Sequence, residues 1–244
     1  MIDRSRHLDL LDDHRRLLAD VATGHLDRPV TTCGDWDVAQ LCAHTAGVFA
    51  FVEATRAAGS VDAPVRVPPP EPDAAVIDAL REAGDELSAG LRGADPTDPV
   101  WSWTDERTAG FWMRRIAYEA TIHRYDGELA VGAAPTTIDA DLAADGIDEW
   151  LTTYLLVAGR HPDPVIDGEA SVHLHCTDTD GEWMVRWADG SPTLTREHGK
   201  GDVAARGPAW SLLLACYGRL DPATSDDVDV FGDAALLATA TGQS

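Results

Sequence analysis

The segment YEATIHRYD, residues 118–126, places Glu119 and His123 four residues apart inside a stretch that otherwise has the pattern of a buried helix. Apolar residues recur at helical spacing from about residue 106 to residue 129, and Glu119 and His123 lie on the same stripe. On a helix the two side chains lie on neighbouring turns of one face, so both can reach one point. An inward carboxylate is unfavourable unless it is protonated or paired with a cation. The stretch therefore predicts a helix with a charged site on its inner face.

A second histidine is expected to face the same interior. A helix that begins near Asp35, its predicted N-cap, carries His44 on the stripe formed by its apolar residues. Two imidazoles and one carboxylate bind a divalent metal and leave one position open, and facing helices of a bundle often build such sites. Simpler interpretations are a solvated Glu–His pair, a hydrogen-bonded histidine, or pairing of Glu119 with Arg115 one turn earlier.

The first part of the chain has helical periodicity and the last part has the period of strands. Helices are expected at about residues 7–22, 35–58, 73–91, 106–129 and 139–157. The proline-rich stretch PVRVPPPEP, residues 64–72, connects two of them and cannot be helical. Short strands are expected at about 172–176, 183–187, 193–196, 202–206 and 228–231, with a helix after Pro208 and another at 233–239.

These patterns predict a helical protein with a second domain of mixed type. We expect a four-helix bundle with the metal site in residues 1–160 and a smaller C-terminal α/β domain in residues 168–244, joined by a linker.

Composition restricts the class of protein. The 244 residues carry a formal charge of −23, which disfavours nucleic acid as a partner because such a surface repels phosphates. The N-terminal segment has charges where an export signal needs an apolar core, and no apolar run is long enough to span a bilayer, so we expect a cytoplasmic protein without a membrane partner. The four widely spaced cysteines indicate neither disulfides nor a thiolate metal site.

Two further groups have alternative interpretations. Asp126, one turn beyond His123, either accepts a hydrogen bond that orients an imidazole or pairs with a surface cation such as Arg124. His173 and His175 in VHLHC share one face of a strand, and His198 follows later in the chain. Histidines so spaced can bind a metal, but no carboxylate has an evident reason to join them, and a polar outward face is the simpler interpretation.

The sequence also resembles the mycothiol-dependent maleylpyruvate isomerase family over nearly its whole length. The matching stretches are GDWDVAQLCAHTAG (34–47), FWMRRIAYEATIHRYDGE (111–128) and a weaker tail, GPAWSLLLACYGRL (207–220) with VDVFGD (228–233). The resemblance implies a DinB-like bundle followed by a C-terminal domain similar to sterol-carrier folds.

For the site, the resemblance implies zinc, or another divalent metal, held by His44, Glu119 and His123, with an open position for the sulfur of mycothiol. It also implies an arginine of the C-terminal domain at the site, and Arg219 in YGRL is the candidate. Members of the family often have a histidine before the glutamate ligand, whereas this chain has Tyr118.

Three functions are compatible with these residues. The first is an enzyme that uses mycothiol and a small electrophile, either an isomerase, in which the thiolate adds to a cis double bond and is then eliminated, or an S-transferase, which releases the adduct. The second is a metal-dependent hydrolase that needs no thiol. The third is a non-enzymatic binder with a structural metal, whose fourth ligand would be Asp126 or another side chain. An anionic dicarboxylate substrate would require a cation, for which Arg115 and Arg219 are candidates.

Overall fold

A computed structural model describes residues 2–156, 166 and 168–241. The chain divides into two compact units, Ile2–Thr136 and a second unit that begins at Thr137. The boundary lies earlier than residue 160 because helix α5 (Ala140–Trp150) packs on α6 (Ala209–Cys216) of the second unit. Most of the expected linker, near residues 158–168, lies outside the described residues.

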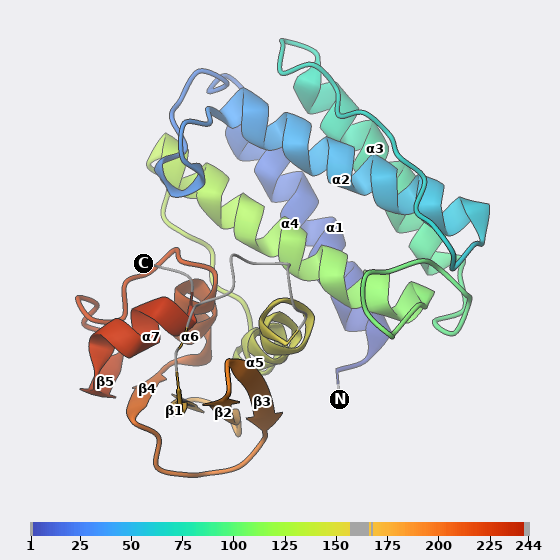
Figure 1. Cartoon of the computed structure of the whole chain (residues 1–244). Helices are drawn as coiled ribbons and strands as arrows, with labels where there is room; N and C mark the ends of the chain where they lie inside the picture. The colour runs from blue at the N-terminus through green and yellow to red at the C-terminus, as the bar shows by residue number, and fades with distance from the viewer. Residues whose placement is uncertain (1, 157–165, 167, 242–244) are drawn as a thin grey trace. The chain divides into compact units, whose positions relative to one another are not determined.

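The first unit is a bundle of four helices, α1 (Arg4–Ala22), α2 (Val38–Ala58), α3 (Val76–Arg92) and α4 (Ala109–Val131) (Figure 1). Helix α1 packs on α4 and α2 packs on α3, while α1–α3 and α2–α4 contacts complete the bundle. The apolar stripes of these helices meet in one core. The predicted helical bundle is confirmed.

The caps explain where the two site-bearing helices begin. Helix α2 starts three residues after Asp35, so the prediction of Asp35 as its N-cap was wrong, and the N-cap is Asp37. The side chain of Asp37 accepts from the backbone N–H of Gln40, and the side chain of Gln40 accepts from the backbone N–H of Asp37. This reciprocal pair is a capping box, which satisfies two donors that a helix start leaves without partners. Thr108 caps α4 in a similar way by accepting from the N–H of Phe111.

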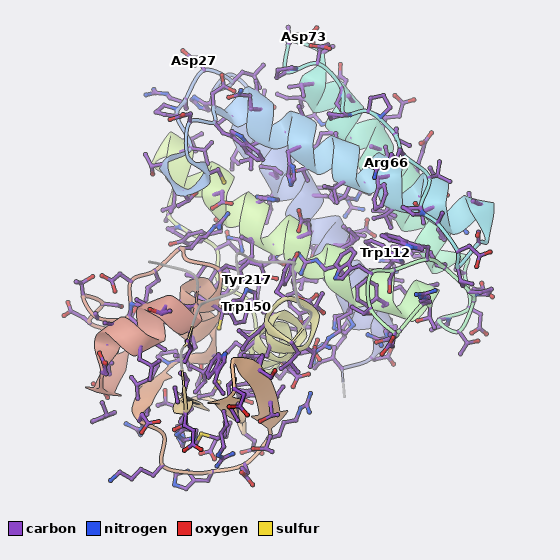
Figure 2. All side chains as sticks on the ribbon, viewed as in Figure 1. Asp27, Arg66, Asp73, Trp112, Trp150 and Tyr217 are labelled. Carbon is purple, nitrogen blue, oxygen red and sulfur yellow. The ribbon has the colours of Figure 1, made fainter. Side chains whose placement is uncertain are left out.

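Aromatic side chains pack where α4 begins. Trp101 and Trp103, from the loop before α4, make edge-on contacts with Trp112, Phe111 and Phe51. The indole N–H of Trp112, which is labelled in Figure 2, donates to the carbonyl of Trp101 at 2.7 Å. Offset and edge-on arrangements of this kind stabilise an aromatic cluster beyond its buried area. The two loop tryptophans therefore pack against the helix end.

The second unit is built on a five-stranded sheet in the order β3-β2-β1-β4-β5. Its strands are β1 (Ala170–Cys176), β2 (Glu182–Ala188), β3 (Ser191–Thr195), β4 (Val203–Gly207) and β5 (Asp229–Gly232). Strands β1 and β4 are parallel and the other pairs are antiparallel. Helices α6 and α7 (Ala234–Ala240) pack on β1 and β4, and a π-helical turn, Leu151–Leu155, follows α5. The predicted smaller α/β part is confirmed.

None of the helices in the described ranges has the length and apolar character needed to cross a bilayer.

Candidate functional site

The inner face of α4 and the facing side of α2 bring three potential metal ligands together. Glu119 and His123 project from consecutive turns of α4, and His44 projects from α2 toward them. One ligand atom from each residue lies within 4.8 Å of the other two. The side chains of His123, Glu119 and His44 are 11%, 15% and 36% exposed, so the cluster is buried on the α4 side and reaches solvent beside His44.

The donor atoms have spacings that fit a metal ion. Nε2 of His44 and Nε2 of His123 each lie 3.2 Å from Oε1 of Glu119, and the two imidazole rings are 5.0 Å apart between centroids. Two ligands bound tetrahedrally to one zinc ion are separated by about 3.3 Å, since each bond is about 2.0–2.1 Å long. The two imidazole nitrogens and the carboxylate oxygen are also the donor types that zinc and related divalent metals accept.

Arg115 contacts the other oxygen of the same carboxylate. Its Nη2 atom lies 2.5 Å from Oε2 of Glu119, and the arginine is buried, with a side chain that is 3% exposed. The alternative partner considered from the sequence is therefore present together with the two histidines. Because Arg115 holds one oxygen, Oε1 is directed at the histidines.

Asp126 orients His123 from the opposite side of the ring. Its fully buried carboxylate accepts from Nδ1 of His123 at 3.0 Å, from Thr32 Oγ1 at 2.6 Å and from Cys33 Sγ at 3.4 Å. The guanidinium of Arg124, the alternative partner considered from the sequence, contacts Glu128. A proton on Nδ1 leaves the lone pair of Nε2 for a metal, which is the usual role of a carboxylate behind a ligating histidine.

The local charges set the protonation of the cluster. Burial alone would raise the pKa of Glu119, but its hydrogen bonds with His123 and His44 and the charge of Arg115 hold that pKa well below its usual range. Burial alone would lower the pKa of His123, but hydrogen bonds with Asp126, Cys33 and Glu119 raise it well above the ordinary value. The carboxylate is thus ionised, and the same acidic groups that favour a proton on His123 would equally favour a metal ion at its Nε2 atom.

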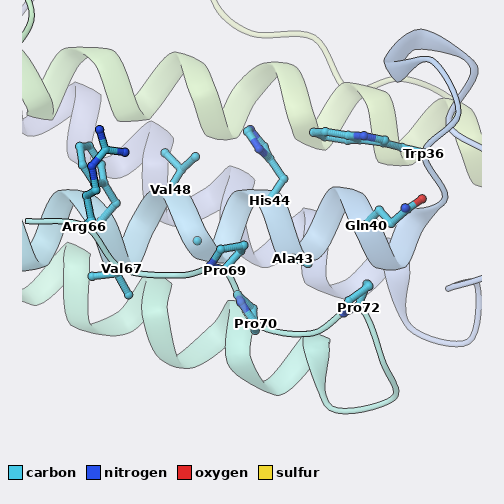
Figure 3. Close-up of a pocket in the computed structure, with 12 residues that line it drawn as sticks. Trp36, Gln40, Ala43, His44, Val48, Arg66, Val67, Pro69, Pro70 and Pro72 are labelled. Atoms are coloured by element: carbon cyan, nitrogen blue, oxygen red, sulfur yellow. The ribbon is translucent and has the colours of Figure 1, made fainter.

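A pocket of about 500 Å³ opens beside His44. One wall is α2, and the other is the proline-rich segment 64–72, which runs along α2 (Figure 3). The segment is tied to α2 by Val65, whose N–H donates to Oγ1 of Thr55 at 3.1 Å. It also passes close to Gly47, where a Cβ would lie 2.8 Å from Cβ and 3.0 Å from Cα of Pro69. Glycine at position 47 thus permits this wall to approach the helix.

Trp36 and Arg66 give the pocket its chemistry. The Trp36 ring lies against His44, with a centroid distance of 4.9 Å, and covers one end of the pocket. Exposed Arg66 lines the other end (Figure 3), and within the described ranges no carboxylate forms an ion pair with it. Sequence reasoning missed Arg66 as a site residue. Its signal was a lone arginine within a proline-rich segment that cannot be helical.

The other residues considered from the sequence have different positions. Tyr118 is fully buried and packs edge-on against His7, so it serves the core. The Cys42 thiol is buried, which raises its pKa to about 12 and makes it a poor nucleophile. Arg219 follows α6 in the second unit, where Nη1 donates to the carbonyl of Tyr217 at 2.7 Å, and its role at the site stays a prediction.

Comparison with known proteins agrees with this architecture, a helical bundle with an internal donor set followed by a small α/β domain. Residues 7–127 match the family model of the mycothiol maleylpyruvate isomerase N-terminal domain, and residues 141–239 match that of the MDMPI C-terminal domain. The chain therefore belongs to the mycothiol-dependent maleylpyruvate isomerase family, and the resemblance to this enzyme family is confirmed.

Solved structures have the same fold at low sequence identity. A crystal structure of a mycothiol-dependent maleylpyruvate isomerase matches with a TM-score of 0.59 and 15% identity over 94% of this chain and 93% of that chain. A histidine-to-alanine mutant of such an isomerase matches with a TM-score of 0.61 at the same identity and coverage. No curated protein matches the sequence.

Proposed function

We propose that this protein is a metal-dependent enzyme that uses mycothiol to isomerise or conjugate a small anionic electrophile. The observation that carries the proposal is the convergence of His44, Glu119 and His123 beside a pocket that also presents a cation, Arg66. Family membership supports the thiol and the reaction class. The four free cysteines suit the reducing cytoplasm, where such a thiol remains a thiol.

His44, Glu119 and His123 would hold the metal, zinc or a related divalent ion. When bound, such an ion lowers the pKa of a coordinated thiol, so that a thiolate is present at neutral pH. Arg115 fixes the Glu119 carboxylate and Asp126 fixes the proton of His123 on Nδ1, so neither ligand must reorganise. Among the described residues, no further ligand joins His44, Glu119 and His123, and Asp126 contacts the ring nitrogen of His123 that faces away from Glu119. The open position favours an enzyme over a closed structural site.

The pocket would bind the electrophile next to that position. Arg66 would pair with a carboxylate of the substrate, and the Trp36 ring and the proline wall would exclude water from the reacting carbon. These roles favour a planar, anionic substrate such as an unsaturated dicarboxylate. Because the cation is at one end of the pocket and His44 is between the two ends, a substrate held by Arg66 extends toward the metal-binding donors.

The test compares the wild-type protein with Glu119→Gln, which keeps the side-chain shape but removes the charge. Metal content and turnover of maleylpyruvate and of model electrophiles are measured with and without mycothiol. We expect the wild-type protein to bind metal in the bundle and to turn over the electrophile only when mycothiol is present. The Glu119→Gln variant should lose both the bundle metal and the thiol-dependent turnover. His25→Ala, a histidine outside the cluster, is the control. Turnover without thiol would favour the hydrolase instead, and unchanged metal binding in Glu119→Gln would contradict the site.

A further inference from the structure

A second group of potential ligands lies on the sheet of the second unit. It consists of His173 and His175 on β1, Glu182 at the start of β2 and His198 in the loop between β3 and β4. One ligand atom from each of the four lies within 4.8 Å of the others. We call these four residues the sheet cluster.

Strand geometry explains three of the four positions. His173 and His175 are two residues apart and so point to one face, while their neighbours Val172, Leu174 and Cys176 point to the other face and are buried. The antiparallel register puts Glu182 directly opposite His175, and its carboxylate contacts Nδ1 of that histidine. The hairpin register thus supplies a carboxylate for this pair, which the sequence alone does not predict.

The fourth position depends on residues 196–202, which fold back over the same face. The loop is anchored at Asp202, whose N–H donates to the carbonyl of Ser171 at 3.0 Å and whose carboxylate accepts from Ser171 Oγ at 2.7 Å. Its backbone lies against β1 at Gly201, where a Cβ would be 3.1 Å from the backbone nitrogen of His173. This approach brings Nδ1 of His198 to 3.3 Å from Glu182 Oε1.

The loop also changes the surroundings of His173. A polar outward face would leave this side chain in solvent, whereas it is only 5% exposed. Its Nε2 atom has no hydrogen-bond partner in the described part of the chain, and a buried polar atom without a partner destabilises the folded state. The three rings meet edge to face with centroid distances of 5.4 to 6.2 Å. Three imidazoles and one carboxylate lie together here, and one imidazole nitrogen has no hydrogen-bond partner among the described residues. Such a set of donors is suited to binding a metal cation.

We propose that the sheet cluster binds a zinc-type divalent metal ion through His173, His175, His198 and Glu182. Three imidazoles and one carboxylate form a complete tetrahedral set, which is typical of a structural site without an open position. The ion would satisfy the buried nitrogen of His173 and tie the 196–202 loop to the sheet. This site is independent of the one in the bundle, because the two share no residue.

The experiment uses the full chain without an affinity tag, with the bundle donors removed by His44→Ala and His123→Ala. After chelation, this background protein is titrated with Zn²⁺ by calorimetry and with Co²⁺ by visible absorption, which reports tetrahedral coordination. The background is then combined with His198→Ala or with Glu182→Gln. His198 has a side chain that is 77% exposed, so its removal leaves the core intact. Glu197→Gln is the matched control, because it neutralises a carboxylate of the same loop outside the sheet cluster.

We expect the background protein to bind one equivalent of metal and the Glu197→Gln control to bind it equally well. His198→Ala and Glu182→Gln should each weaken binding by more than the roughly 10- to 100-fold that loss of an outer-shell contact produces. Zn²⁺ should also raise the unfolding temperature of the background protein but not that of the His198→Ala variant. The proposal is overturned if the background protein binds no metal, or if His198→Ala and Glu182→Gln bind it as the control does.

Discussion

The bundle and the sheet each gather histidines around one carboxylate, but they position them differently. In the bundle, His44, Glu119 and His123 come from two long helices, and Asp126 and Arg115 hold the ligands from behind. In the sheet, two histidines share a strand and the last donor comes from a loop. The bundle site has three donors and an adjoining pocket, whereas the sheet cluster has four donors and buries one of them. The first arrangement suits catalysis and the second suits a structural ion.

The largest expected effect separates the two clusters by metal count. We predict that His123→Ala reduces the bound metal from two equivalents per chain to one and reduces thiol-dependent turnover to background, because the two-donor remnant in the bundle no longer competes for the ion. Metal analysis of the purified protein measures the number of bound ions, and an assay with mycothiol measures the thiol-dependent turnover. His198→Ala should give the complementary result, one equivalent lost with turnover retained. Loss of activity in both variants would contradict the division of roles.

A smaller effect should come from the residue that orients His123. Replacing Asp126 by Asn removes the negative charge that fixes the proton on Nδ1, so metal affinity of the bundle should fall by about 10- to 100-fold. Titration with a competing chelator measures this change. The sheet cluster, which lacks Asp126, serves as the internal control, and its affinity should not change.

Arg66 lines the pocket beside the bundle site and has no counterpart among the four residues of the sheet cluster. We predict that Arg66→Ala raises KM for an anionic electrophile roughly fivefold with kcat unchanged, because an exposed ion pair contributes up to about 1 kcal/mol. The KM for an uncharged electrophile should stay the same, and metal content should not move. Equal changes in KM for both electrophiles would show that Arg66 does not recognise charge.

A further prediction, on stability, concerns a buried histidine that has no role in either cluster. Burial, together with nearby Arg124, lowers the pKa of His14 to about 3. Because the unfolded chain takes up this proton near its ordinary pKa of about 6.5, the folded state loses stability as the pH falls from there toward the lower value. His14→Gln should therefore lose less of its free energy of unfolding between about pH 7 and about pH 5 than the wild-type protein. Urea unfolding at the two pH values measures this difference, and His25→Gln is the control. Equal losses of free energy of unfolding in the wild-type protein, His14→Gln and His25→Gln would contradict the prediction.

Periodicity in the sequence was enough to predict the helices, most strands and the inward stripe with Glu119 and His123. These features follow from local patterns with periods of 3.6 and 2 residues, which tertiary contacts did not override. The choice of Asp35 as N-cap was wrong because two aspartates precede α2 and only the one at position 37 forms the capping box with Gln40. A single residue near a helix start carries little information about which acceptor forms the cap.

The remaining features depend on contacts between distant segments. The pocket exists because residues 64–72 approach α2 at Gly47, and the sheet cluster exists because the 196–202 loop folds back on β1. Neither approach is encoded in a repeating pattern. Asp126 was recognised as a possible orienting acceptor from helix spacing, but its partners Thr32 and Cys33 lie more than 90 positions away in the chain, with sequence separations of 94 and 93.

Anomalous scattering at the zinc absorption edge, measured on crystals of the tag-free protein, tests the central claim most directly. The account predicts a peak bounded by Nε2 of His44, Oε1 of Glu119 and Nε2 of His123, with one coordination position not taken by a side chain. A crystal grown with zinc that has no peak among these three residues, or a peak there with four protein ligands, would contradict it.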